Sequence, residues 1–213
     1  YSRSSSAPLK GSITLDFVLN GTLGTPQVTG KMATSSLNLN GITPTNASAL
    51  FTIDSTAITV DHFTVNFGPN QFTSHGRFFW LSEIVDIEAS AQFGQLAEFQ
   101  PLFPAGWFPA GLGRAHVTVK GPLGSLRGRA HLQFQTVEII GQQFDSVTID
   151  LSSERSTIVL NKLRLLRDRY EAKATGWYDT EGATFSGSFE TAAFPITSRQ
   201  NDSDAGIPVA AQL

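Results

Sequence analysis

The sequence has no cysteine, a single methionine, and charged residues at only 15% of its 213 positions. Without cysteine there can be no disulfide framework and no cysteine-ligated metal site, and the absence is compatible with an oxidising envelope compartment. The net charge of −3 argues against a general nucleic-acid binder. No apolar run approaches the length needed to cross a bilayer. Tyr1 begins no recognisable signal peptide and is not a natural start, so we expect a piece of a longer protein.

Catalytic signatures are also missing. Neither glycine-rich turn fits the dinucleotide pattern Gly-x-Gly-x-x-Gly, and no nucleophile elbow or phosphate loop occurs. Two of the carboxylates Glu83, Asp86 and Glu88 could form an acid–base pair, but solvated positions at strand edges explain these residues better. The four histidines are His62, His75, His116 and His131, and none of them has the spacing of a metal site. His116 and His131 fall at strand positions that are expected to face outward. We therefore expect no enzyme, no metal and no cofactor.

What the sequence does have is alternation. Apolar residues recur at every second position from Ile13 to Leu19, while Thr14, Asp16 and Asn20 point the other way, which is the pattern of a half-buried strand. Similar segments follow one another as far as Thr191, separated by turns rich in glycine, asparagine and proline. The apolar parity changes across Asp61 and His62, which predicts a bulge or a tight turn there. The sequence therefore predicts an all-β fold, an antiparallel meander.

The strand pattern occurs twice in the chain, as an internal repeat. The glycine-rich turn at residues 21–31 returns at 121–129, and later positions match one hundred residues apart: Gly41 and Gly141, Ile58 and Ile158, Val60 and Leu160, Phe63 and Leu163, Val65 and Leu165, and Gly76 and Gly176. A period this long predicts several strands in each unit. Between the units, Leu96, Phe99 and Phe103 form one apolar stripe of a short helix, which either caps a unit or serves as an ordinary packed linker. The expected divisions are a leader (1–10), a first β unit (11–94), a helix and aromatic connector (95–113), a second β unit (114–194) and a disordered or linking tail (195–213).

Particular stretches of the second unit carry a resemblance. They are Val-Lys-Gly-Pro-Leu-Gly-Ser-Leu-Arg-Gly-Arg-Ala-His-Leu (119–132), Ile-Val-Leu-Asn-Lys-Leu-Arg-Leu (158–165) and Ala-Thr-Gly (174–176). Together with the matching turns of the first unit, they resemble the AsmA/TamB group of bacterial envelope proteins over residues 11–194. The resemblance implies a long, curled antiparallel sheet that forms an apolar β-groove (a β-taco). It also implies a periplasmic location, with an inner-membrane anchor elsewhere in the chain, and phospholipid transport between membranes. For TamB-like members it also implies a part in outer-membrane protein assembly, and so an outer-membrane protein partner.

The apolar face of such a sheet must be buried against something. Acyl chains would do this in a groove, with about 0.8 kcal/mol gained for each methylene buried. The expected lining is Leu15, Phe17, Phe51, Phe63, Phe67, Phe93, Phe134, Ile149, Leu163, Phe185 and Phe189. The same residues fit the dry core of a sandwich, so a structural, adhesive or carbohydrate-binding sandwich or solenoid module is the alternative. Basic residues cluster in the second unit, among them Arg164, Arg167 and Arg169. These three arginines could contact lipid phosphates, or they could simply keep an outward face soluble.

Overall fold

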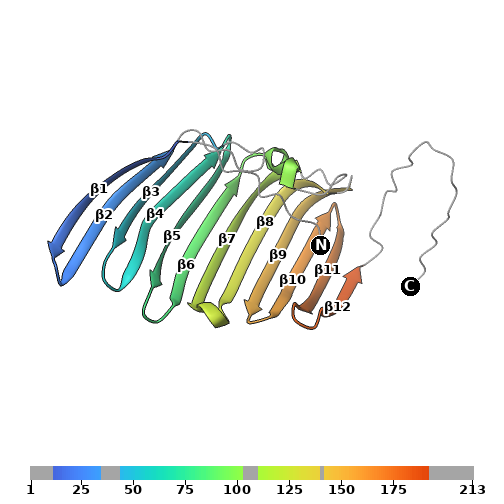
Figure 1. The fold of residues 1–213 in the computed structure, drawn as a ribbon. Helices are drawn as coiled ribbons and strands as arrows, with labels where there is room; N and C mark the ends of the chain where they lie inside the picture. Colours follow the sequence, from blue (N-terminus) through green and yellow to red (C-terminus); the bar gives the residue numbers. More distant parts are fainter. Residues whose placement is uncertain (1–11, 35–43, 103–109, 140–141, 192–213) are drawn as a thin grey trace, which may run out of the picture.

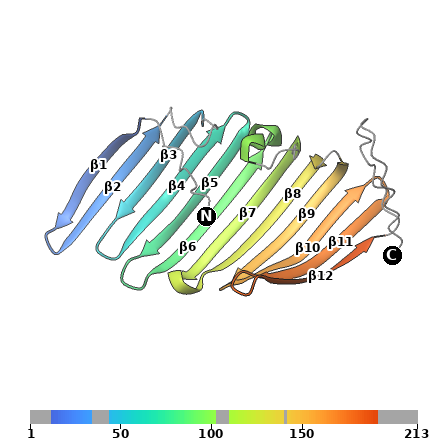
Figure 2. The ribbon, with the colours of Figure 1, turned by 45° about the vertical axis from the view of Figure 1, so that its right-hand side comes forward.

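The computed structural model describes residues 12–34, 44–102, 110–139 and 142–191, and most of them lie in one antiparallel sheet. Each of the twelve strands pairs with the next one along the chain, and β1 and β12 stand at opposite edges of an open sheet (Figures 1 and 2). The strands are β1 (Thr14–Thr22), β2 (Thr25–Thr34), β3 (Asn46–Ile53), β4 (Ala57–Phe67), β5 (Asn70–Phe79), β6 (Ile84–Phe93), β7 (Ala110–Pro122), β8 (Arg127–Ile139), β9 (Gln142–Glu154), β10 (Thr157–Arg167), β11 (Tyr170–Asp179) and β12 (Thr184–Thr191). The all-β, antiparallel fold predicted from the alternation is confirmed.

The strand register collects the apolar side chains on one face of the sheet, called here the apolar face. Because successive side chains of a strand point to opposite faces, residues paired across strands share a face. One row of paired residues crosses nine strands and is apolar throughout: Val65, Phe72, Ala91, Ala115, Leu132, Ile149, Leu163, Ala174 and Phe189. The opposite side, the polar face, carries the residues between them, as in the row Ser90, His116, His131, Asp150 and Lys162.

Two bulges keep this separation of faces intact. The pairing of β4 shifts register between Val60 and Phe63, where the parity change at Asp61 and His62 predicts an irregularity. The pairing of β10 with β11 shifts between Leu160 and Leu163. In both strands the extra residue lets apolar side chains before and after the shift point to the same face.

The two halves of the sheet have matching strand bounds. Strands β4, β5 and β6 begin one hundred residues before β10, β11 and β12, respectively. The sheet nevertheless crosses the middle of the chain without a break, because β6 pairs with β7 over ten residue pairs from Ile84 with Pro122 to Phe93 with Gly113.

A 3-10 helix, η1 (Leu96–Leu102), follows β6 and covers one end of the apolar face. Side chains three residues apart align along a 3-10 helix, so Leu96 and Phe99 both point at the sheet. Leu96 packs against Val137 and Val147, and Phe99 packs against Phe67. The second 3-10 helix, η2 (Leu123–Ser125), only joins β7 to β8. Phe103, the aromatic connector at 107–109, the predicted turn around Gly41, the leader and the tail lie outside the described residues.

A buried asparagine fastens η1 to the turn between β4 and β5. Asn70 is fully buried. Its side-chain amide donates hydrogen bonds to the Phe67 carbonyl (3.0 Å) and to Glu98 Oε2 (3.1 Å), and its Oδ1 accepts one from the Gln95 backbone N–H (3.0 Å). One side chain therefore satisfies polar groups of both the turn and the segment that leads into the helix.

The tight turn between β3 and β4 predicts a pH-dependent stability. Asp54 Oδ1 accepts hydrogen bonds from the Thr56 hydroxyl (2.7 Å), the Thr56 N–H (2.7 Å) and the Ala57 N–H (2.9 Å). These bonds, the Thr56 hydroxyl first, lower the pKa of Asp54 below its ordinary 3.8. A lowered folded-state pKa stabilises the protein above the unfolded-state pKa, and the gain is lost as the pH falls through the folded value.

We therefore expect Asp54→Ala to destabilise the protein at neutral pH and to unfold like the wild type in strong acid. Urea unfolding followed by tryptophan fluorescence would measure this, because Trp80 Nε1 donates to the Asp54 carbonyl at 3.3 Å. A stability difference that stays constant down to the lowest pH would contradict this role of the carboxylate.

Candidate functional site

The predicted lining residues all lie on the apolar face, but in three different settings. Phe67, Phe93, Phe134, Ile149 and Leu163 belong to the two clusters packed under η1. Phe51 and Phe63 are half-buried, and the Phe51 ring lies over Gly30, where a Cβ atom would overlap it. The remaining four are exposed, near the two edges of the sheet: Leu15, Phe17, Phe185 and Phe189.

The described residues place no second layer over most of the apolar face. Among the described residues, only eleven hydrophobic side chains are buried, and the two packed clusters both involve η1. Near β1 the Phe17 side chain is 63% exposed, and on β12 the Phe185 side chain is 82% exposed. Extended apolar surfaces with exposed aromatic side chains are uncommon on proteins unless they bind something.

A small hollow lies on this face beside the packed rings. It has a volume of about 330 Å³ and is walled by Phe63, Phe72 and Phe93. Ala89, Ala91 and Ala115 line it as well, and their short side chains leave the space open. This volume lies at the lower end of the range for small-molecule sites, and the lining is almost entirely apolar.

The three arginines predicted to contact phosphate do not lie together. Arg164 is on the polar face and donates to Glu171, which also accepts from Lys173 (2.9 Å). The hydrogen bonds from Lys173 and Arg164 lower the pKa of Glu171. Arg167 alternates to the other face, and its guanidinium donates to Gln142 Oε1 at 3.4 Å. Arg169 lies in the following turn, with its guanidinium 5.4 Å from the Tyr170 ring centre. Phosphate contacts by these side chains remain a prediction.

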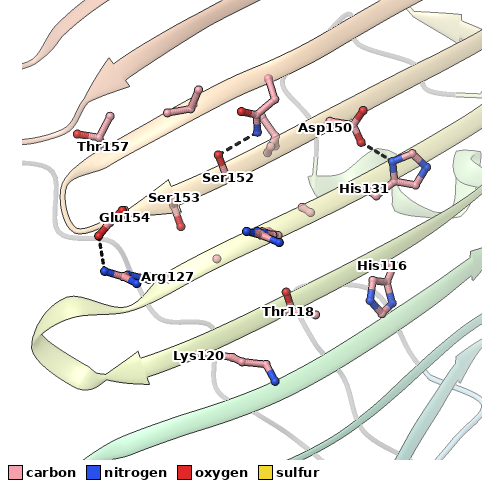
Figure 3. A pocket seen from close by; sticks show the side chains of 16 residues that line it. His116, Thr118, Lys120, Arg127, His131, Asp150, Ser152, Ser153, Glu154 and Thr157 are labelled. Atoms are coloured by element: carbon pink, nitrogen blue, oxygen red, sulfur yellow. Dashed lines mark hydrogen bonds and ion pairs between the residues drawn. The ribbon is translucent and has the colours of Figure 1, made fainter.

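The polar face has a larger hollow over β7, β8, β9 and β10, with a volume of about 1250 Å³ (Figure 3). Its charged lining includes Lys120, Arg127, Arg129, Asp150 and Glu154. Arg127 pairs with Glu154 at 2.7 Å, and the imidazole of His131 pairs with Asp150. Thr118 and Ser152 contribute hydroxyl side chains in the row between these pairs, and Thr157 contributes one beside Glu154.

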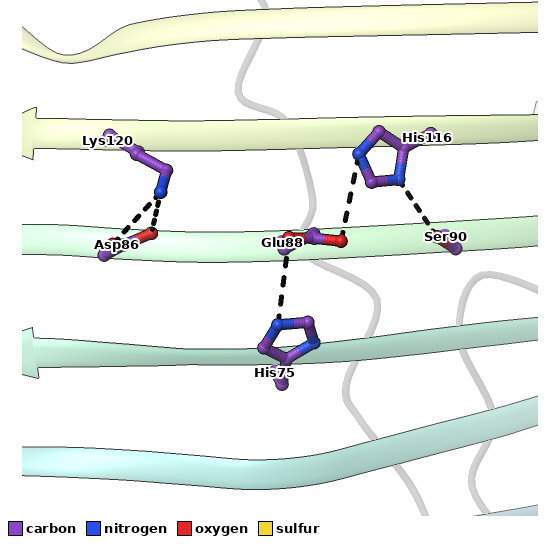
Figure 4. A network of polar contacts seen from close by, with 6 residues as sticks. All are labelled: His75, Asp86, Glu88, Ser90, His116 and Lys120. Atoms are coloured by element: carbon purple, nitrogen blue, oxygen red, sulfur yellow. Dashed lines mark hydrogen bonds and ion pairs between the residues drawn. The ribbon is translucent and has the colours of Figure 1, made fainter.

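A chain of polar contacts leads from this hollow across β6 to β5 (Figure 4). Lys120 Nζ lies 3.0 Å from Asp86. Glu88 lies between two histidines, 3.8 Å from His75 Nε2 and 3.9 Å from His116 Nε2. Asp86 and Glu88 therefore each face a basic side chain rather than one another, unlike the carboxylates of a general acid–base pair.

Within the described ranges, no group of three or more His, Asp or Glu side chains could hold a metal ion.

Neither hollow could be predicted from the alternation alone, which does not show that His116, Thr118 and Ser152 lie around Arg129. Polar residues at every second position on both sides of the η2 turn, at 116, 118 and 120 and at 127, 129 and 131, were the available signal. This alternation predicts the hollow only if the register of β7 with β8 is known, in which Lys120 pairs with Arg127.

No protein-family model matches this chain, and comparisons with curated proteins and with solved structures returned no match either. In the part of the chain that the structure describes, no helix has the length and apolar character needed to span a membrane.

Proposed function

We propose that the apolar face binds the acyl chains of phospholipids, in a longer envelope protein that shields lipid in transit between two membranes. The observation that carries the proposal is a twelve-stranded sheet with an apolar face that η1 covers at one end only, among the described residues. Water-exposed aromatic side chains at both edges of the sheet are the feature that a bound acyl chain would explain.

The dimensions of the sheet suit an extended apolar ligand. Twelve strands at a spacing of about 4.8 Å give an arc of roughly 50 Å, along which the apolar face continues from β1 to β12. Contacts with acyl chains are non-directional, at about 0.8 kcal/mol for each buried methylene, so affinity can accumulate without a sequence-specific pocket. The hollow beside η1 would hold the end of such a chain or a methyl branch.

The sandwich alternative needs a second sheet on the apolar face, and the described residues form only one sheet. The resemblance of residues 11–194 to the AsmA/TamB group agrees with an acyl-binding function. A periplasmic location, an inner-membrane anchor outside this chain and a part in outer-membrane protein assembly belong to the same proposal.

Adjacent side chains on β1 provide a matched test. Phe17 and Val18 are similarly exposed, at 63% and 60%, but they point to the apolar and the polar face, respectively. Native mass spectrometry with lipid extraction should find co-purified phospholipid in the wild type and in Val18→Asp. It should find much less in Phe17→Asp combined with Phe189→Asp, because the two carboxylates put charge in the path of the acyl chains.

These positions are preferable to Phe134, which packs under η1 and whose loss would disturb the fold itself. Circular dichroism should show the same strand content in all variants. A lipid-free wild type that takes up no phospholipid added in detergent would overturn the proposal, as would equal lipid loss in Val18→Asp.

A further inference from the structure

The hollow on the polar face is built from three parallel rows of side chains. Neighbouring strands contribute one residue each, and successive rows lie about 6.8 Å apart along the strands. The outer rows are Lys120, Arg127, Glu154 and Thr157 at one end and His116, His131 and Asp150 at the other. The middle row is Thr118, Arg129, Ser152 and Val159. Over the four strands β7 to β10, Arg129 is therefore the only charged residue of the middle row, and its direct neighbours are two short hydroxyl side chains. The row continues on β6 to Glu88, which pairs with Thr118 across the strands and lies near His75 and His116.

The carboxylates around Arg129 are each engaged by another basic side chain. Glu154 is held by Arg127 at 2.7 Å, and Asp150 is held by His131. Lys120 has its own partner in Asp86, at 3.0 Å. Within residues 12–34, 44–102, 110–139 and 142–191, no ion pair is found for Arg129 itself. The hollow thus holds one guanidinium that has no direct ion pair among the described residues, and its neighbours along the strands, Arg127 and His131, are held by Glu154 and Asp150.

The donors around Arg129 favour a tetrahedral oxyanion over a planar carboxylate. A group bound above the guanidinium has Arg127 on one side along the strand and His131 on the other, with the Thr118 and Ser152 hydroxyls across the strands. Donors that converge from several directions suit the three or four oxygens of a phosphate group. The side chains lining the hollow include no Phe, Tyr or Trp, so the usual stacking platform for a neutral sugar is missing among them.

We propose that this hollow binds a phosphate group, with the Arg129 guanidinium as its principal contact. At about 1250 Å³ the hollow is larger than an inorganic ion requires, so the phosphate is carried by a larger polar molecule or by a lipid headgroup. The site lies on the opposite face from the acyl-binding surface and does not depend on it.

Arginine side-chain NMR provides the direct test. The Nε–H signal of Arg129 should shift saturably when glycerol 3-phosphate is added at constant ionic strength, and sodium chloride at the same ionic strength should not reproduce the shift. In Arg129→Gln we expect affinity to fall by about tenfold or more, because a charge-assisted contact is lost. The matched control is Arg114→Gln on the same face, outside the hollow, where Arg114 Nε donates to Gln133 at 2.7 Å. This control should bind like the wild type.

A second arm identifies the source of the phosphate. Sedimentation with phosphatidylcholine vesicles that do or do not contain phosphatidic acid compares a lipid-borne phosphate with the soluble probe. Binding that depends on Arg129 supports the site in either experiment. Binding to glycerol 3-phosphate assigns a soluble source of the phosphate, and binding to vesicles with phosphatidic acid assigns a lipid-borne one. If Arg129→Gln changes neither arm, or if Arg114→Gln loses as much affinity, the proposal is overturned. Arg129 is exposed, so its substitution should leave the fold intact.

Discussion

Replacing Phe99 by alanine is expected to lower the free energy of unfolding by about 3–5 kcal/mol. Phe99 is 8% exposed and is the residue through which the second turn of η1 contacts the sheet. Its ring packs edge-on against three other rings, with centres 5.9 Å from Phe67, 5.7 Å from Phe72 and 5.8 Å from Phe93. Truncation leaves a cavity among these rings, and the single sheet has little other core with which to fill it.

Phe185→Ala is the matched control for this measurement. It is the same substitution on the same face, but the Phe185 ring is 82% exposed, so we expect a change within about 0.5 kcal/mol. Urea unfolding monitored by circular dichroism gives both values. Equal losses in the two variants would mean that η1 does not pack on the sheet as described.

Replacing Asn70 by alanine is expected to cost about 2–3 kcal/mol, although the substitution removes little apolar area. The loss has a polar origin. Without the side chain, the Gln95 N–H and the Phe67 carbonyl lose their bonds to Asn70, and Glu98 Oε2 loses a donor. Buried groups left without partners retain their desolvation cost, which makes removing one partner more expensive than the net worth of the bond.

Asn66→Ala provides the comparison, since the Asn66 amide makes an exposed bond to Asn46 at 2.7 Å that water can replace. Asn70→Asp is a sharper version, because it would put a second carboxylate next to Glu98 at neutral pH. Its stability relative to the wild type should improve as the pH falls toward carboxyl pKa values, because Asp54 and its acid sensitivity are common to both proteins. Urea unfolding of both proteins across pH would show this, and a stability difference that does not change with pH would exclude the contact with Glu98.

Much of the fold was predictable because a period of two carries most of the structural information in this chain. From Ile13 to Leu19 the alternation places Leu15 and Phe17 on one face, and the parity change at Asp61 and His62 anticipates the register shift in β4. Local pattern sufficed here because each strand pairs with its neighbour in sequence.

Contacts between turns and faces were not predictable in the same way. Asn70 and Glu98 are 28 positions apart, and no periodicity relates a turn to the helix that packs on it. The arginines show a related failure, since closeness in sequence suggested one cluster while alternation sent Arg164 and Arg167 to different faces. The pairing of Arg129 with Thr118 and Ser152 depends on how long the turns are, which fixes the register of β7, β8 and β9.

The uninterrupted neighbour-to-neighbour order of the strands bears on how the chain acquires its structure. No strand has to wait for a partner from a distant part of the sequence, so each loop closed during folding is short and its entropic cost is small. A hairpin formed anywhere could serve as a template for the next strand on either side, as in linear repeat proteins. Folding could then proceed by zipping outward from the η1 region, where packing is densest, and β1 and β12 would be the last strands to form and the first to fray.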